Sequence, residues 1–220
     1  WSMTNRAPPP EVTRERRLFL DKIEHVLDVP SDAFRLSGVW RQQSDLEATR
    51  VLEPLSVSVA KSPWPVAFAF GQWEKYGLKR PGFNWVAVAE FRRRDPILIV
   101  HTGTAVRSLM QLKDKFIVPC TSGSRNALTY VSFIEVAPWN QHGHPRRRFR
   151  GLGPLMLRFA CQRSRQSGWG GRLGFHAVSK PHIERFYAGL GFVRVDCPNE
   201  YHEEYFELEP DAASRFLAES

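Results

Sequence analysis

The sequence has few cysteines and no long hydrophobic run. Its three cysteines, Cys120, Cys161 and Cys197, lie far apart and form neither a CxxC pattern nor an obvious disulfide framework. They predict reduced, partly buried thiols in a cytoplasmic protein. The one close histidine pair, His142 and His144, has no further ligands at metal spacing, so no metal is expected. Because no stretch of about 18 apolar residues occurs, we expect no membrane span.

Acidic residues are outnumbered by basic ones. The 220 residues include 31 lysines and arginines against 23 aspartates and glutamates, which gives a net charge of +8. A basic chain favours an anionic partner. The charge alone leaves nucleic acid, an acidic protein and a phosphorylated cofactor open.

The length suits one medium domain with a terminal extension. We expect an N-terminal lead and helix over residues 1–30 and a single domain over 31–220. In the first part of the chain, the hydrophobic pattern predicts a helix at 11–27, a strand at 34–41, a short helix at 45–52, a hairpin of strands 83–91 and 97–101, and a short helix at 104–113.

The later part has clearer patterns. It predicts strands at 128–137, 172–178, 192–195 and 205–208, and helices at 154–167 and 181–190. Both faces of 128–137 are largely apolar, which is typical of a central strand. Gly168 suits the left-handed end of the first helix, and Ser179 is expected to cap the second, with Pro181 in its first turn. The order indicates an α/β fold with a right-handed crossover.

A basic, glycine-containing loop precedes the helix at 154–167. The first N–H groups of a helix lack internal acceptors and bear a partial positive charge, so they suit a pyrophosphate. Gly151 and Gly153 allow close approach of a ligand to the backbone. Four arginines at positions 146, 147, 148 and 150 crowd this positive end, which indicates an anion site. The alternative is a solvated basic loop with glycines for a turn.

Two motifs flank this helix at a characteristic spacing. Val136-x-Pro138 followed by Arg148-x-x-Gly151-x-Gly153 resembles motif A of the GNAT superfamily of acyltransferases. Farther on, the segment 185–192 (RFYAGLGF) resembles the family's FYxxLGF signature, and 137–140 (APWN) is similar to a turn of a bacterial GNAT subgroup. The resemblance covers about residues 125–209. It implies a GNAT-like α/β fold, with a mixed, mostly antiparallel central sheet flanked by helices and an N-terminal helical extension.

The resemblance also implies a reaction and its residues. GNAT enzymes transfer an acetyl group from acetyl-CoA to a primary amine by direct attack in a ternary complex, without a metal. Backbone groups near Val136 would bind the pantetheine arm, and Tyr187 would protonate the CoA sulfur. The segment expected to hold the pyrophosphate consists of Arg148, Phe149, Arg150, Gly151, Leu152, Gly153 and Pro154. The alternative for Tyr187 is a core position beside Phe186, which is compatible with the acid role.

The general base has several candidates. Glu135 is the only charged residue in the strand at 128–137, and a buried carboxylate needs a partner or a purpose. A salt bridge to an arginine would explain it equally well. His176 is an alternative because an imidazole has a convenient pKa of about 6.5. It could also be simply hydrogen-bonded in the sheet, and proton removal by water needs no dedicated base.

The acceptor stays open at this stage. It is an amine of a small molecule, a protein or an aminoacyl-tRNA, since some GNAT toxins acetylate aminoacyl-tRNA and a basic surface would suit that substrate. Two other classes compete with the enzyme: a basic nucleic-acid-binding protein, and an inactive domain that binds acyl-CoA. We expect no membrane partner and leave open whether the protein forms a homodimer.

Overall fold

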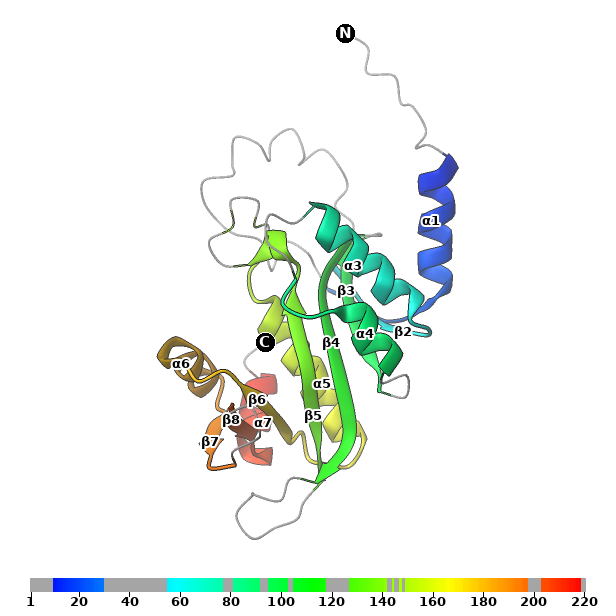
Figure 1. The fold of residues 1–220 in the computed structure, drawn as a ribbon. Helices are drawn as coiled ribbons and strands as arrows, with labels where there is room; N and C mark the ends of the chain where they lie inside the picture. Colours follow the sequence, from blue (N-terminus) through cyan, green and yellow to red (C-terminus); the bar gives the residue numbers. More distant parts are fainter. Residues whose placement is uncertain are drawn as a thin grey trace. The chain divides into compact units, whose positions relative to one another are not determined.

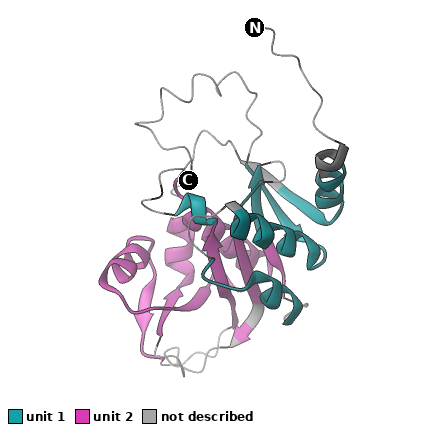
Figure 2. Cartoon of the chain, turned by 45° about the horizontal axis from the view of Figure 1, so that its top comes forward, with its two compact units in different colours: residues 1–93, 99–107, 137–148 teal, residues 94–98, 108–136, 149–220 magenta. Residues whose placement is uncertain are grey.

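The computed structural model describes residues 10–29, 55–76, 81–91, 95–102, 105–117, 127–141, 144, 147, 149–197 and 203–218. The chain divides into two compact units (Figure 2). Unit 1 comprises Trp1–Arg93, Ile99–Arg107 and Ala137–Arg148, and unit 2 comprises Arg94–Leu98, Ser108–Val136 and Phe149–Ser220. The predicted strand at 34–41 and helix at 45–52 lie outside the described residues.

Helices and strands are interspersed along the chain (Figure 1). The elements are α1 (Pro10–Asp21), β1 (Ile23–Val29), β2 (Leu55–Ala60), α3 (Trp64–Tyr76), α4 (Trp85–Phe91), β3 (Ile97–Thr102), β4 (Ala105–Ile117), β5 (Ala127–Val136), the short 3-10 helix η2 (Pro138–Asn140), α5 (Leu152–Gln166), β6 (Leu173–Ala177), α6 (Pro181–Gly189), β7 (Val193–Val195), β8 (Glu204–Leu208) and α7 (Pro210–Ala218). The strands pair in the order β1-β2-β3-β4-β5-β6-β8-β7. The predicted α/β class with a mixed, mostly antiparallel sheet is confirmed.

In unit 1 the first predicted helix is too long. The helix α1 ends at Asp21, and the prediction of helix over 23–27 is wrong because this segment is the strand β1. Ile23 pairs with Ala60 in an antiparallel ladder with β2. The backbone N–H of Lys22 bonds to the carbonyl of Phe19 at 3.1 Å and closes the turn between helix and strand.

The predicted strand at 83–91 is also wrong, because Trp85–Phe91 is the helix α4. Asn84 precedes it, and its Oδ1 accepts a hydrogen bond from the N–H of Ala87 at 3.1 Å, which is the geometry of an N-cap. Trp85 and Ala89, four residues apart, are buried on one helical face. Trp85 packs edge-on against Trp73 of α3, with ring centroids 6.5 Å apart.

The predicted helix at 104–113 is wrong as well. These residues belong to β4, which pairs antiparallel with β5. Five successive residues of β4, 108 to 112, are buried, so polar and apolar positions do not alternate strictly there. A continuous apolar run in a covered strand is hard to distinguish from a buried helix.

Unit 2 follows the sequence predictions closely. The strands at 128–137, 172–178, 192–195 and 205–208 and both helices are confirmed within a few residues, although α5 starts at Leu152 rather than at Pro154. Gly168 and Gly191 have the positive φ expected after the helices. The predicted Ser179 cap is wrong: Lys180 is the N-cap of α6, and Ser179 donates to Glu204 Oε1 at 2.9 Å.

The cysteine prediction is confirmed for one residue and wrong for another. Cys161 is a free, buried thiol on α5. Cys197 forms a disulfide, so the expectation of reduced thiols does not hold for it. Within the described part of the chain, no helix is both long and apolar enough to cross a membrane.

Candidate active site

The N-terminus of α5 lacks the usual cap. Its N-cap residue is Gly151, in the left-handed region (φ 79°, ψ 8°), and among the described residues no side chain forms a cap hydrogen bond there. The first turn has no acidic residue, and Pro154 has no N–H. Leu155 donates its N–H to the carbonyl of Gly151 at 2.9 Å. The amides of Leu152 and Gly153 therefore stand at the positive end of a 15-residue helix without a side-chain acceptor.

The two glycines of this turn, Gly151 and Gly153, differ in backbone conformation and in the space around them. Gly151 needs a backbone conformation that residues with a Cβ rarely adopt. Gly153 has no such requirement, and a Cβ added there would meet no atom within 4 Å. Open space over a helix N-terminus leaves room for a ligand to reach the backbone.

The other residues predicted to hold the pyrophosphate differ in how far their side chains are exposed. The side chains of Phe149 and Leu152 are buried at 5% and 2% exposure, so they belong to the core of unit 2. Arg150 is exposed immediately before the N-cap, and Pro154 is half-buried. Arg146 and Arg148 lie outside the described residues, so the predicted cluster of four arginines is described only at Arg147 and Arg150.

This helix end follows the carboxyl end of β5, where β5 and β6 fork. The two parallel strands pair only at Thr129 with Leu173 and at Tyr130 with Gly174. Beyond Tyr130 and Gly174, both strands continue, but their residues no longer pair with each other. Between β4 and β5 the register skips Ser132, which is a β-bulge at the start of the fork. Ligands of α/β sheets bind at the carboxyl ends of parallel strands, where this fork opens.

Tyr187 lies in an aromatic cluster of α6, β6 and β8. Its ring centroid is 4.5 Å from that of Phe175, 5.3 Å from that of Phe206 and 5.1 Å from that of Phe186. Burial raises the pKa of the Tyr187 hydroxyl above its ordinary value, so the phenol stays protonated near neutral pH. The core packing that the sequence offered as the alternative for Tyr187 is present.

Glu135 lies on the sheet face opposite α5. Ser108 of β4 touches Met156 of α5, with Oγ 2.6 Å from Sδ, so Ser108 and its partner Val136 face this helix. Neighbouring strand residues alternate between faces, which places Glu135 and its partner Leu109 on the other side. The Glu135 side chain is half-buried rather than enclosed.

His176 is hydrogen-bonded through both ring nitrogens. Its Nε2 lies 3.2 Å from the carbonyl oxygen of Cys197, and its Nδ1 lies 2.7 Å from the hydroxyl of Tyr130. The expectation that His176 is hydrogen-bonded in the sheet is therefore confirmed.

No family model and no curated protein matches the sequence. Among solved structures, a GNAT-family protein from Desulfovibrio desulfuricans, assigned as an acetyltransferase, matches with a TM-score of 0.51 and 16% identity, over 71% of this chain and 99% of the other. The chain has the GNAT fold.

Two further acetyltransferase structures match with lower scores. A Salmonella typhimurium protein assigned as an acetyltransferase, solved with its cofactor acetyl-CoA, has a TM-score of 0.45 and 16% identity over 71% of this chain and 94% of its own. The PaiA N-acetyltransferase of Thermoplasma acidophilum, in complex with coenzyme A, has a TM-score of 0.43 and 14% identity over 70% and 99%.

The GNAT sheet of unit 2 also contains a buried polar group that the sequence did not reveal. Arg172 pairs with Glu207 inside the protein, and the hydroxyl of Tyr205 lies 3.3 Å from Glu207 Oε2. Burial raises the pKa of both Tyr205 and Glu207. The available signal was a charged residue immediately before β6, Arg172, and another within β8, Glu207.

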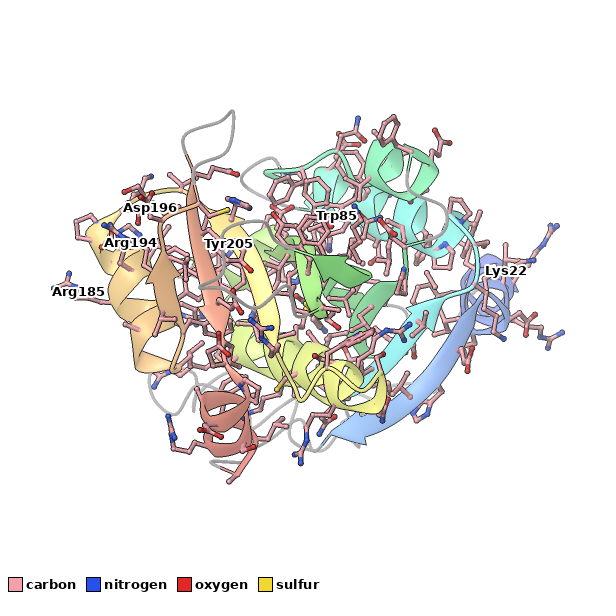
Figure 3. All side chains as sticks on the ribbon, turned by 90° about the horizontal axis from the view of Figure 1, so that it is seen from below. Lys22, Trp85, Arg185, Arg194, Asp196 and Tyr205 are labelled. Atoms are coloured by element: carbon pink, nitrogen blue, oxygen red, sulfur yellow. The ribbon has the colours of Figure 1, made fainter. Side chains whose placement is uncertain are left out.

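The Tyr205 side chain also reaches the two strands beside β8. Its ring lies 5.1 Å from that of His176, and a Cβ at Gly174 would collide with its hydroxyl. Tyr205 lines a cavity at the β7–β8 end of this GNAT sheet, together with Arg194, Val195, Asp196, Cys197, Glu203 and Glu204. Figure 3 labels Tyr205, Arg194 and Asp196. In the described ranges, no three metal-binding side chains come close enough together to hold a metal ion.

Proposed function

We propose that the protein is an acetyl-CoA-dependent N-acetyltransferase. The observation that carries this proposal is the uncapped N-terminus of α5, with Gly151 and open space at Gly153, beside the fork of β5 and β6. A pyrophosphate is an anion that two unsatisfied amides at a helix N-terminus can bind. The GNAT fold supports the proposal because the Desulfovibrio desulfuricans protein that shares it is assigned as an acetyltransferase.

The donor would be held by the backbone of the turn and of β5. Amides from Arg150 to Gly153 would bind the pyrophosphate, and Arg148 would add charge. The backbone of Val136, at the end of β5, would pair with the pantetheine arm. Phe149, Leu152 and Pro154 would keep the turn in place, the first two through their buried side chains.

The reaction forms a C–N bond and breaks a C–S bond. A primary amine with a pKa of about 10.4 must first lose a proton, since only the neutral nitrogen attacks the thioester carbonyl. Tyr187 would then give its phenolic proton to the departing thiolate. We keep Glu135 as a candidate base because it lies on the face opposite α5, where an amine can approach the fork.

The acceptor is proposed to be cationic before it reacts. The cavity beside Tyr205 is lined by three carboxylates, Asp196, Glu203 and Glu204, against one guanidinium, Arg194. In a chain with a net charge of +8, such a locally acidic wall suits an ammonium group. Aminoacyl-tRNA combines an amine with a polyanion and is the second candidate acceptor.

The first experiment measures binding of the donor by thermal unfolding. Acetyl-CoA at 100 times its Kd is expected to stabilise the fold by about 2.7 kcal/mol, which raises the Tm by roughly 5–10 °C for a protein of this size. Gly153→Trp is expected to abolish the shift, because its side chain would occupy the open space over the helix end. No shift with acetyl-CoA, or the same shift in Gly153→Trp, would contradict the proposal.

The matched control is Gly71→Trp. Gly71 lies exposed in α3 of unit 1, and a Cβ there also meets no atom within 4 Å. This variant is expected to keep the full shift. Release of free CoA in the presence of polyamines, lysine peptides or aminoacyl-tRNA then separates an enzyme from an inactive acyl-CoA-binding domain.

A further inference from the structure

The hydrogen bonds of His176 define which nitrogen has the proton. A backbone carbonyl only accepts hydrogen bonds, so the Nε2 atom beside the Cys197 carbonyl must be the N–H donor. In a neutral imidazole the other nitrogen is then an acceptor. Tyr130 therefore donates its hydroxyl proton to Nδ1 across 2.7 Å. This is the protonation state in which His176 can take up one more proton, at Nδ1.

The pair lies at the base of the fork. Tyr130 and Gly174 are the last paired residues of β5 and β6, and His176 is two residues farther along β6. The Tyr130–His176 bond thus connects the two strands where their register ends. Both side chains are half-buried.

The pair and Tyr187 lie on opposite faces of the sheet. Lys113 and Tyr130 are paired and share the face opposite α5, since Lys113 is five residues from Ser108 in the same strand. His176 bonds to Tyr130 and shares that face, whereas Phe175 points to the other and packs on Tyr187. A thioester between the strands would have its leaving sulfur on one side and an approaching amine on the other.

We propose that Tyr130 and His176 form a proton relay that neutralises the acceptor amine; this inference rests on the proposed acetyltransferase function. The ammonium group transfers one proton to Tyr130 Oη while the phenolic proton of Tyr130 moves to His176 Nδ1. The products are a neutral amine, an unchanged tyrosine and an imidazolium that donates to Tyr130 and to the Cys197 carbonyl. After the amine has formed the C–N bond and the thiolate has left with the proton of Tyr187, the new amide nitrogen gives its excess proton to water and Tyr187 takes one up from water. The imidazolium loses its proton to water.

The surroundings of His176 hold the ring in the orientation that the relay needs. Tyr205 packs on it at 5.1 Å, and its hydroxyl in turn contacts Glu207, which is paired with the buried Arg172. Phe116 packs against the ring of Tyr130 with 4.6 Å between centroids. Both partners of the relay are therefore fixed by neighbours that take no part in the proton transfer.

The decisive variant is His176→Gln. A glutamine side chain accepts a hydrogen bond from Tyr130 and donates one to the Cys197 carbonyl, but it cannot take up a proton. We expect kcat to fall about 100-fold or more, as is typical of a lost general base, while the Tm and the acetyl-CoA-induced shift stay as in the wild type. Tyr130→Phe, which interrupts the relay and leaves the imidazole, is expected to lower kcat by a similar factor.

Two controls accompany these variants. Ser214→Ala removes an exposed hydrogen bond on α7, from Ser214 Oγ to the carbonyl of Pro210 at 3.0 Å, and is expected to leave kcat unchanged. Glu135→Gln tests the competing base. A 100-fold loss in Glu135→Gln together with full activity in His176→Gln would overturn the relay. Failure of the proposed function itself is recognised separately, by the absence of an acetyl-CoA shift in the wild-type protein.

A second measurement needs no acceptor. In ¹⁵N-histidine-labelled protein, the resonances of His176 are expected to show a protonated Nε2 and an unprotonated, hydrogen-bonded Nδ1 at pH above the imidazole titration. His176→Gln identifies the signal by its loss. A proton on Nδ1 in the neutral ring would overturn the proposal, since that nitrogen could not accept one from Tyr130.

Discussion

At the scale of single residues, the three tyrosines around the fork differ in what surrounds their hydroxyls. Tyr130 donates to His176, and Tyr205 contacts the carboxylate of Glu207. Tyr187 is enclosed by aromatic rings, and burial alone accounts for its raised pKa. A phenol without a charged neighbour keeps its proton until a base such as a thiolate forms beside it.

Tyr187→Phe is expected to lower kcat about 100-fold while the acetyl-CoA-induced rise in Tm is kept. The ring stays in the aromatic cluster, so the loss is confined to the proton donor. The measurement is steady-state turnover with acetyl-CoA beside thermal unfolding of the same samples. Phe186→Leu, on the exposed side of α6, is the control that changes packing and leaves the hydroxyl. Unchanged turnover in Tyr187→Phe would exclude Tyr187 as the acid.

At the scale of elements, α5 connects the turn at Gly151 to the core of unit 2 through its buried face. Cys161 lies on that face, and its Sγ donates to the carbonyl of Gly171 at 3.3 Å. Burial raises the pKa of this thiol from 9.0 to about 11, against a smaller lowering by Arg165. The thiolate is therefore disfavoured in the folded protein and unhindered in the unfolded chain.

The pH dependence of stability follows from this difference. Well below pH 9 the Cys161 thiol keeps its proton in both the folded and the unfolded state. In that range Cys161 contributes no pH dependence to the free energy of unfolding. Between pH 9 and 11 the unfolded chain loses the proton first, so stability falls as the pH rises, by about 1.4 kcal/mol at pH 10. Urea unfolding of the wild type and of Cys161→Ala at pH 8 and pH 10 measures this loss of stability. The difference between the two proteins should shrink at pH 10, and a difference that does not change with pH would contradict the cause.

The elements that the sequence predicted correctly have periodic patterns and clear end signals. Strand β5, helix α5 and helix α6 are of this kind, with Gly168 and Gly191 at their ends. Strand β4 was mistaken for a helix because neighbouring elements cover both of its faces and remove the alternation. Helix α4 was mistaken for a strand because β-rich residues at 83–91 outweighed the capping signal of Asn84.

The site itself could be predicted only where backbone chemistry determines it. The glycines at 151 and 153 and the position of Tyr187 follow from local motifs. The Tyr130–His176 bond joins residues 46 positions apart, and the pairing of Arg172 with Glu207 spans 35. Contacts of this kind depend on how β5, β6 and β8 align, and no local pattern in the sequence specifies that alignment.

At the scale of the whole molecule, the excess of basic residues bears on the choice of acceptor. A net charge of +8 is a general attraction for polyanions and is screened by salt. An aminoacyl-tRNA acceptor would use this attraction, whereas a small cationic amine would gain nothing from it. The dependence of binding on ionic strength therefore discriminates between the two acceptor classes.

If aminoacyl-tRNA is the acceptor, tRNA is expected to bind at 50 mM salt and to lose at least about tenfold in affinity by 200 mM, because bound phosphates release counterions. Filter binding over this range gives the slope of log K against log salt. A morpholino oligonucleotide of equal length, which has no phosphates, is the control and should not bind. Absence of tRNA binding at 50 mM salt would eliminate this acceptor class.

The contact between Gly174 and Tyr205 bears on how this site could evolve. A methyl group at position 174 would lie 2.9 Å from the ring carbon that bears the Tyr205 hydroxyl, with the hydroxyl closer still. Strand β6 can therefore exchange its glycine only after β8 has lost its tyrosine. Related sequences with a tyrosine at position 205 are therefore expected to have a glycine at position 174, so that the two positions covary. Because Tyr205 also supports the ring of His176, a lineage that abandons this pair would lose the anchor of the relay in the same step.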